Sequence, residues 1–283
     1  MLLTLLLWLA GTAHGRELRV MTYNVWGLPG VLTVLPGRFP RLVREIRKLD
    51  VDVVALQEIF TARAKPLTEL VEFPYRAFGP GRKGIRTNSG LLILSRYPIV
   101  QTATIEYPEC RGSDCFANKG ALWARIDVNG QFISVFTTHT NAGQSAKIKA
   151  ARALQIDRFL AFIQNSAGSD PVLILTDLNS KPDSAAYDTM RREGFRDSHA
   201  EYRETVPLSP VEYAGNTLDP IRNRNIRIGK WFVKPFRIDY VWVRGNWKVI
   251  RTQLMFDHLV EGRFLSDHFG VRADLVLESE YVP

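Results

Sequence analysis

The chain has 283 residues, of which 46% are hydrophobic and 23% charged, and its 37 basic and 29 acidic side chains give a formal net charge of +8. This composition is typical of a globular protein. It excludes a disordered chain, a collagen and a disulfide-rich scaffold, because apolar residues are plentiful, glycine has no period and there are only two cysteines. The positive charge favours polyanions in general, so it does not separate nucleic acid from an acidic membrane surface.

The chain begins with an apolar run, residues 2–10 (LLTLLLWLA), that ends in small residues around Ala13 and Gly15. Such a run is typical of a secretory signal peptide, so we expect residues 1–15 to be removed and the protein to be secreted. The run lacks the usual preceding basic residues, and a buried first strand is the alternative. Without a linker, repeat or change of composition, residues 16–283 are expected to form one domain.

The two cysteines, Cys110 and Cys115, lie close together in the sequence. Because export places a protein in an oxidising environment, this spacing predicts a local disulfide. Metal binding is the alternative, but zinc requires two further Cys or His ligands, and the sequence has no histidine near the pair. A bridge that closes so short a loop contributes roughly 2 kcal/mol at best, so it would fix the loop rather than the fold.

Hydrophobic periodicity predicts a mixture of strands and helices along the chain. In order, we expect a strand at residues 18–23, a helix at 39–49, strands at 51–56, 90–94, 121–128 and 132–137, a helix at 146–164, a strand at 172–175, a helix at 184–193, and strands at 238–243, 249–256 and 271–277. Asn129-Gly130 predicts a hairpin turn between two of the strands. The helix at 146–164 is expected to bury an apolar stripe consisting of Ala153, Ile156, Leu160 and Ile163.

Polar residues gather where these strands begin or end. They occur in residues 22–24 (TYN), 57–58 (QE), 138–141 (THTN), 177–179 (DLN), 237–240 (RIDY) and 266–268 (SDH). Any one of these groups would be ordinary turn chemistry. Six of them in a fixed order indicate a shared functional site.

This ordered set resembles the endonuclease/exonuclease/phosphatase superfamily of metal-dependent phosphoesterases. Within that superfamily the chain is most similar to the secreted neutral sphingomyelinases, through residues 24–29 (NVWGLP), 90–99 (GLLILSRYPI) and 118–120 (NKG). The resemblance implies an α/β fold of four layers (DNase I-like), in which two mixed β-sheets pack face to face with helices outside. Thr176 departs from the pattern, because much of the superfamily has glycine there, and it makes that turn more crowded.

The resemblance and the residue types together imply a Mg²⁺ site, in which Mn²⁺ or Co²⁺ could substitute. Mg²⁺ prefers hard oxygen ligands and takes one or two carboxylates. Glu58 is the expected ligand with Asn24 beside it, and Asp267 is expected to bind the metal directly or through water. For Glu58 the alternative is a salt bridge at the end of a strand.

The remaining residues of the motifs suit the hydrolysis of a phosphodiester by water. His268 is the expected general base, since imidazole titrates near neutral pH, and Asp239 would orient its ring. Asp177 would position the attacking water. Asn179 and His139 would donate hydrogen bonds to the phosphoryl oxygens, where negative charge is concentrated in the transition state.

Two basic features are left open by the sequence. Lys119 could lie near the phosphate or could be an ordinary surface lysine. Residues 79–90 form a basic, glycine-rich loop that could lie at the rim of the site, although a solvated hairpin loop is favoured.

The segment 226–236 (IRIGKWFVKPF) interleaves aromatic and basic residues. Trp231, Phe232 and Phe236 could enter a membrane interface while the basic groups contact headgroup phosphates. The alternative is that these aromatic residues belong to the core.

We therefore expect a secreted, Mg²⁺-dependent phosphodiesterase that hydrolyses sphingomyelin to ceramide and phosphocholine at a membrane surface, with no protein partner. A secreted DNase I-like nuclease, which would bind nucleic acid, is the first alternative, and a phosphoinositide phosphatase is the second. From a different class, a catalytically idle membrane-binding module is the third.

Overall fold

A computed structural model describes residues 16–28, 37–223, 225 and 234–278. The predicted signal peptide, residues 1–15, lies outside these ranges, as do Trp231 and Phe232. The strands are β1 (Arg16–Asn24), β2 (Val53–Gln57), β3 (Tyr75–Phe78), β4 (Leu92–Ser95), β5 (Ile99–Glu106), β6 (Gly120–Val128), β7 (Gln131–Thr138), β8 (Val172–Asp177), β9 (Arg196–Asp197), β10 (Asp239–Arg244), β11 (Trp247–Met255) and β12 (Gly270–Leu277). The helices are α1 (Arg38–Arg47), α2 (Ala146–Ala167), α3 (Ala185–Arg192), α4 (Ser198–Tyr202) and α5 (Pro210–Ala214), with 3-10 helices η2 (Ala62–Glu69) and η3 (Gly112–Phe116).

The strands form two sheets of six. One sheet has the order β11-β12-β1-β2-β4-β3 and the other has the order β5-β6-β7-β8-β10-β9. Both sheets are mixed, since β1 pairs in parallel with β2 and β7 in parallel with β8, while their other pairings are antiparallel. The predicted turn at Asn129-Gly130 joins β6 and β7, and both of its residues have positive φ.

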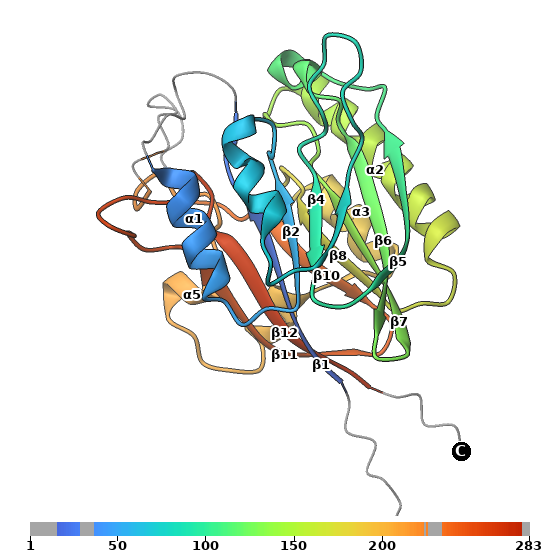
Figure 1. Ribbon diagram of the computed structural model, residues 1–283, viewed down its shortest axis with the longest axis vertical. Helices are drawn as coiled ribbons and strands as arrows, with labels where there is room; N and C mark the ends of the chain where they lie inside the picture. The colour runs from blue at the N-terminus through green and yellow to red at the C-terminus, as the bar shows by residue number, and fades with distance from the viewer. Residues whose placement is uncertain (1–15, 29–36, 224, 226–233, 279–283) are drawn as a thin grey trace, which may run out of the picture.

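Three hydrophobic clusters separate the layers. Figure 1 shows α1 and α2 on opposite sides of the sheets. In strand β1, successive side chains point to opposite faces of the sheet and therefore enter different clusters. Val20 faces a cluster shared by both sheets, whereas Met21 packs into a second cluster with residues of α1 and η2. A third cluster joins the other sheet to α2 and α3. The four-layer α/β sandwich that the sequence implied is confirmed.

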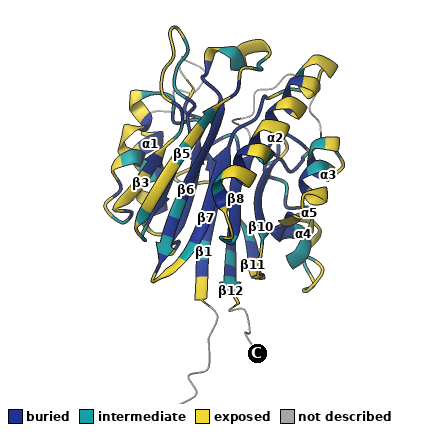
Figure 2. Cartoon of the chain, turned by 90° about the vertical axis from the view of Figure 1, so that its right-hand side faces the viewer, coloured by how far each residue is buried: buried dark blue, intermediate teal, exposed yellow. Residues whose placement is uncertain are grey.

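Most of the predicted elements are present, with small shifts at their ends, and the main error concerns α2. Ile156 and Ile163 are buried as predicted, but Ala153 is exposed and Leu160 is only half-buried. Phe159 and Phe162 are buried instead, in the cluster beneath the helix. The buried face is rotated from the predicted stripe, because the large aromatic side chains fill the space over the sheet. Figure 2 shows α2 with an exposed outer face and a buried inner face.

The central strands bring the predicted polar motifs to one edge of both sheets. Strands β1, β2 and β8 end at this edge, and β10 and β12 begin there, because they run antiparallel to β8 and β1. Asp239 is therefore directly opposite Asp177 in the β10–β8 register, and His139 forms a bridge beside Asp177. The topology alone places the predicted polar motifs together.

Cys110 and Cys115 are joined by a disulfide with a Cα–Cα distance of 5.2 Å, and it encloses the start of η3. Within the described ranges, we find no helix with the length and apolar character needed to cross a membrane.

Candidate active site

All eight predicted site residues meet at the edge of the two sheets. Seven of them line a cavity of about 300 Å³, and Asp239 lies behind it against His268. The seven are Asn24, Glu58, His139, Asp177, Asn179, Asp267 and His268. The structure thus brings together residues that are up to 244 positions apart in the chain.

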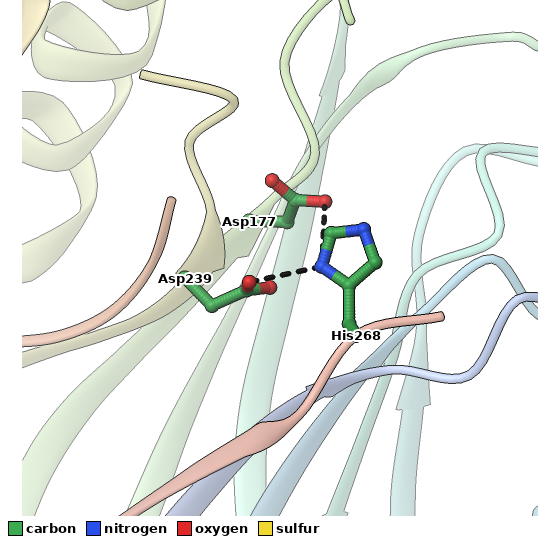
Figure 3. Close-up of side chains that lie close together, drawn as sticks. All are labelled: Asp177, Asp239 and His268. Carbon is green, nitrogen blue, oxygen red and sulfur yellow. Dashed lines mark hydrogen bonds and ion pairs between the residues drawn. The ribbon is translucent and has the colours of Figure 1, made fainter. Parts of the chain in front are cut away.

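His268 and Asp239 form a buried pair (Figure 3). Nδ1 of His268 lies 2.9 Å from Oδ2 of Asp239 and 3.9 Å from Oδ2 of Asp177. Burial lowers the pKa of His268, but Asp239, Asp177 and the neighbouring Asp267 outweigh it and hold the pKa well above its usual value. Because Nδ1 faces Asp239, the other ring nitrogen, Nε2, is left to act in the cavity.

Glu58 is half-buried, and one of its carboxylate oxygens is shielded from solvent and unsatisfied. Nδ2 of Asn24 donates to its Oε1 at 3.0 Å, but its Oε2 has no hydrogen-bond partner in the described part of the chain. Burial, and next the charge of Asp267, raise the pKa of Glu58 to about 8. Burial also raises the pKa of Asp267.

Two neighbouring, half-buried carboxyl groups whose pKa values are both raised fit a divalent cation, which would supply the missing positive charge. Glu58, Asp267 and the side-chain oxygen of Asn24 are the hard oxygen donors that Mg²⁺ accepts. Asp177, Asp239 and His268 also offer three ligand atoms within 4.8 Å of one another. Nδ1 of His268 and Oδ2 of Asp239 are already hydrogen-bonded to each other, so this pair is suited to proton transfer rather than to metal binding.

Asn24, Asp177 and His139 link the two sides of the cavity. Nδ2 of Asn24 donates to Oδ2 of Asp177 at 3.0 Å as well as to Glu58. Nε2 of His139 lies 3.5 Å from the same Asp177 oxygen. Burial, and next the charge of Lys119, lower the pKa of His139 to about 3, so this imidazole is neutral near pH 7 and can donate only from one ring nitrogen.

Two site residues hold left-handed backbone conformations that side chains rarely adopt. Glu58 has φ of 64° and Asn179 has φ of 49°. Such strain persists only where the surroundings fix it, and it is common at functional sites. Gly27 provides part of this fit, because a Cβ there would lie 2.1 Å from the backbone oxygen of Glu58.

Buried cations that the sequence did not single out support the loops of the site. Arg38 donates to the backbone oxygens of Val25, Trp26 and Leu265, which joins the loop after β1 to the loop that carries His268. Arg152 of α2 likewise bonds the backbone oxygens of residues 141, 143 and 179. No motif marks these arginines, since their role is apparent only once the loops are adjacent.

Lys119 is neither on the surface nor directed at the cavity. It is buried, pairs with Asp114 at 2.9 Å and donates to the backbone oxygen of Thr140 at 3.0 Å. It therefore supports the segment that carries His139. Thr176, the departure from the superfamily pattern, is accommodated inside β8, where its hydroxyl donates to the backbone oxygen of Thr138 at 2.6 Å.

Phe236 forms part of an apolar wall of the cavity. It packs with Leu218 and Ile238, and the three side chains line the cavity opposite the polar residues. Nζ of Lys181 lies 4.7 Å from the centre of the Phe236 ring. Only 9% of the surface of Phe236 is exposed, so in this structure its side chain lines the cavity and is not available to a membrane. The expected membrane contact would then be made by Trp231 and Phe232.

The fold and the site define a class of enzyme, and residues 21–268 match the Endonuclease/Exonuclease/phosphatase family. The chain belongs to this family, as its motifs indicated.

Among relatives, the chain is 28% identical over 92% of its length to a putative neutral sphingomyelinase of Drosophila melanogaster, and it spans 61% of that protein. It is also 30% identical over 61% of its length to a sphingomyelinase C of Leptospira interrogans, of which it spans 36%. The chain thus spans less than two thirds of either relative. Its fold is similar to a magnesium-bound mutant of Staphylococcus aureus beta toxin, with a TM-score of 0.70 and 22% identity over 91% of this chain and 99% of the toxin.

Proposed function

We propose that this protein is a secreted phosphoric diester hydrolase that uses Mg²⁺ to cleave sphingomyelin into ceramide and phosphocholine. The observation that supports the reaction is the arrangement of the cavity, where His268, held by Asp239 behind it, lines the same space as the carboxylates of Glu58 and Asp267. The names of its relatives support a sphingolipid as the substrate.

In this mechanism Nε2 of His268 accepts a proton from the attacking water, while Asp239 holds the ring and stabilises its charged form. Asp177, between His268 and His139, positions that water. Asn179 and neutral His139 donate hydrogen bonds to the phosphoryl oxygens. A divalent cation held by Glu58, Asn24 and Asp267 would supply additional positive charge for the phosphoryl group.

Secretion and membrane contact are part of the proposal. The apolar start of the sequence and the disulfide support export. A lipid substrate requires the cavity to face a bilayer, and the aromatic pair Trp231 and Phe232, next to the cavity wall in sequence, is suited to that contact.

The experiment that tests the function measures phosphocholine release from sphingomyelin vesicles by the purified protein, with Mg²⁺ and with EDTA. A plasmid-nicking assay runs in parallel under the same conditions. We expect release that requires the metal and no nicking. Nicking without release would reject the lipid substrate while keeping the catalytic assignments, and neither activity would reject the hydrolase.

Replacing Asp177 by Asn tests the same roles inside the cavity. The substitution keeps the shape of the side chain but removes its charge, so release should fall at least about a hundredfold. The control is Asp183→Asn, an exposed aspartate at the start of α3, which should retain full activity.

A further inference from the structure

A second surface, formed by residues other than 226–236, exposes large apolar side chains at the cavity end of the molecule. Ile85 is 91% exposed and Phe116 is 69% exposed, although isoleucine and phenylalanine are among the residues most often buried. Ile85 lies in the loop between β3 and β4, and Phe116 ends η3. Figure 1 shows this loop and η3 together at the upper end of the molecule, the end at which β1 finishes.

Hydrogen bonds join the two segments that carry Ile85 and Phe116. The backbone N–H of Thr87 donates to the oxygen of Phe116 at 2.8 Å, and that of Asn118 donates to the oxygen of Thr87 at 3.0 Å. Nδ2 of Asn118 also donates to the oxygen of Gly81 at 2.9 Å. These bonds join the loop to the segment after η3, so Ile85 and Phe116 project from the same unit.

Positive charge surrounds the two apolar side chains. Arg82, Arg86 and Arg111 form no salt bridge within the described residues, whereas the acidic side chains nearby are already paired. Glu106 binds Lys83, Glu109 binds Arg158 and Asp114 binds Lys119. The net charge left at this surface is therefore positive.

This surface is connected directly to the rim of the cavity. The backbone N–H of Arg111 donates to Oδ1 of Asn141 at 2.7 Å, and the N–H of Ala142 donates to Oδ2 of Asp114 at 2.7 Å. Ala142 itself lines the cavity. A flat partner that covers Ile85 and Phe116 would therefore also lie across the mouth of the cavity.

We propose that Ile85, Phe116, Arg82, Arg86 and Arg111, which we name the apolar-basic tip, bind the interface of an anionic lipid bilayer. The apolar side chains enter the headgroup region and the arginines bind lipid phosphates and carboxylates, a combination that suits an interface more than a protein groove or a nucleic acid. The proposal deepens the proposed function, since a lipid-cleaving cavity must reach its substrate in a membrane.

The test measures binding of the full chain to phosphatidylcholine vesicles with and without phosphatidylserine, in EDTA so that no substrate is turned over. Ile85→Ser combined with Phe116→Ser should weaken binding at least about tenfold. Replacing the three arginines by glutamine should weaken binding only to vesicles with phosphatidylserine, by roughly fivefold per arginine, and most at low salt. Because none of the five side chains lines the cavity, hydrolysis of a soluble short-chain substrate should stay unchanged.

The matched control is Val100→Ser combined with Ile250→Ser, two side chains that are 51% and 46% exposed on β5 and β11, toward the opposite end of the strands. Equal vesicle binding by the tip variant and the wild type would overturn the proposal, as would an equal loss in the control variant. A tip variant that loses only plasmid binding would also overturn it, in favour of nucleic acid. If the wild type hydrolyses no phosphodiester but the tip variant still loses vesicle binding, the proposed function fails and the docking surface stands.

Discussion

Glu58 shows how a single residue can be unfavourable for the fold and useful to the site. One oxygen of its carboxylate is shielded from solvent and unsatisfied, and its backbone has a left-handed conformation. The sequence predicted its place at the end of a strand, because a carboxylate there interrupts an apolar pattern. The sequence also predicted Asp267 as a second metal-binding residue, but it could not predict the effect of Asp267 on the pKa of Glu58, because that effect depends on a contact between distant parts of the chain.

The stability of the metal-free protein should depend on pH through Glu58. Below about pH 4.5 the carboxyl is protonated in the folded and the unfolded chain, and between there and about 8 only the folded chain keeps the proton. Raising the pH across this range therefore destabilises the metal-free protein, by on the order of a few kcal/mol. Thermal unfolding in EDTA should show this loss.

The same measurement tests whether Mg²⁺ binds at Glu58. Mg²⁺ should raise the melting temperature more at pH 8 than at pH 5, since only the ionised site binds it well. Glu58→Gln should reduce both the pH dependence and the response to Mg²⁺. A variant that still gains the full stabilisation from Mg²⁺ would place the ion elsewhere.

Asp239→Asn should act on catalysis through His268. The carboxylate raises the pKa of His268, so its removal lowers that pKa and also frees the ring to rotate. We expect kcat to fall about a hundredfold or more, and the acidic limb of the kcat/KM profile to move to lower pH. A profile with an unchanged acidic limb would show that another group titrates there.

At the scale of elements, the sequence predicted the buried strands well and the exposed ones poorly. β1, β6 and β8 are almost fully buried, so their apolar runs are plain. β3 and β5 are edge strands, and β3 buries only Ala77. β5 has only half-buried residues on its inner face, so neither strand presents the fully buried apolar face that identifies a strand, and pairing with a neighbour defines them.

Gly27→Ala tests the close contact between the loops that follow β1 and β2. A Cβ at this position would meet the backbone oxygen of Glu58, so the loop must move and Glu58 with it. We expect a loss of roughly 1–3 kcal/mol in the free energy of unfolding, together with a weaker response to Mg²⁺. Gly81→Ala, where a Cβ has open space, is the control and should change neither quantity.

At the scale of the whole molecule, both sheets contribute residues to the site. Gln57 of β2 donates to Thr22 in its own sheet at 3.0 Å and to Thr137 of the other sheet at 3.2 Å, directly beneath the cavity. The ordered motifs predicted the seven polar residues that the structure brings together in the cavity, and Asp239 beside them. They did not identify the buried arginines or Thr217, whose hydroxyl accepts from the backbone N–H of Asp239 at 3.2 Å, because such supports depend on the complete packing.

Separating catalysis from membrane binding is a test of the molecule as a whole. Because the tip and the cavity are different surfaces, Asp177→Asn should bind vesicles as the wild type does while releasing almost no phosphocholine. Vesicle flotation and product assays on the same samples would show this. If the variant also keeps any damage that the protein causes to cells, membrane binding rather than hydrolysis would be its function.

The pairing of β1 with β12 also has a consequence for the order of events during synthesis. Asn24 ends the first strand and His268 precedes the last, and these strands are neighbours in the sheet. A growing chain therefore carries no complete cavity until His268 and β12 have emerged and β12 has paired with β1, a slow step because the contact is so non-local. During synthesis the cell is thereby exposed to the complete site only after this pairing.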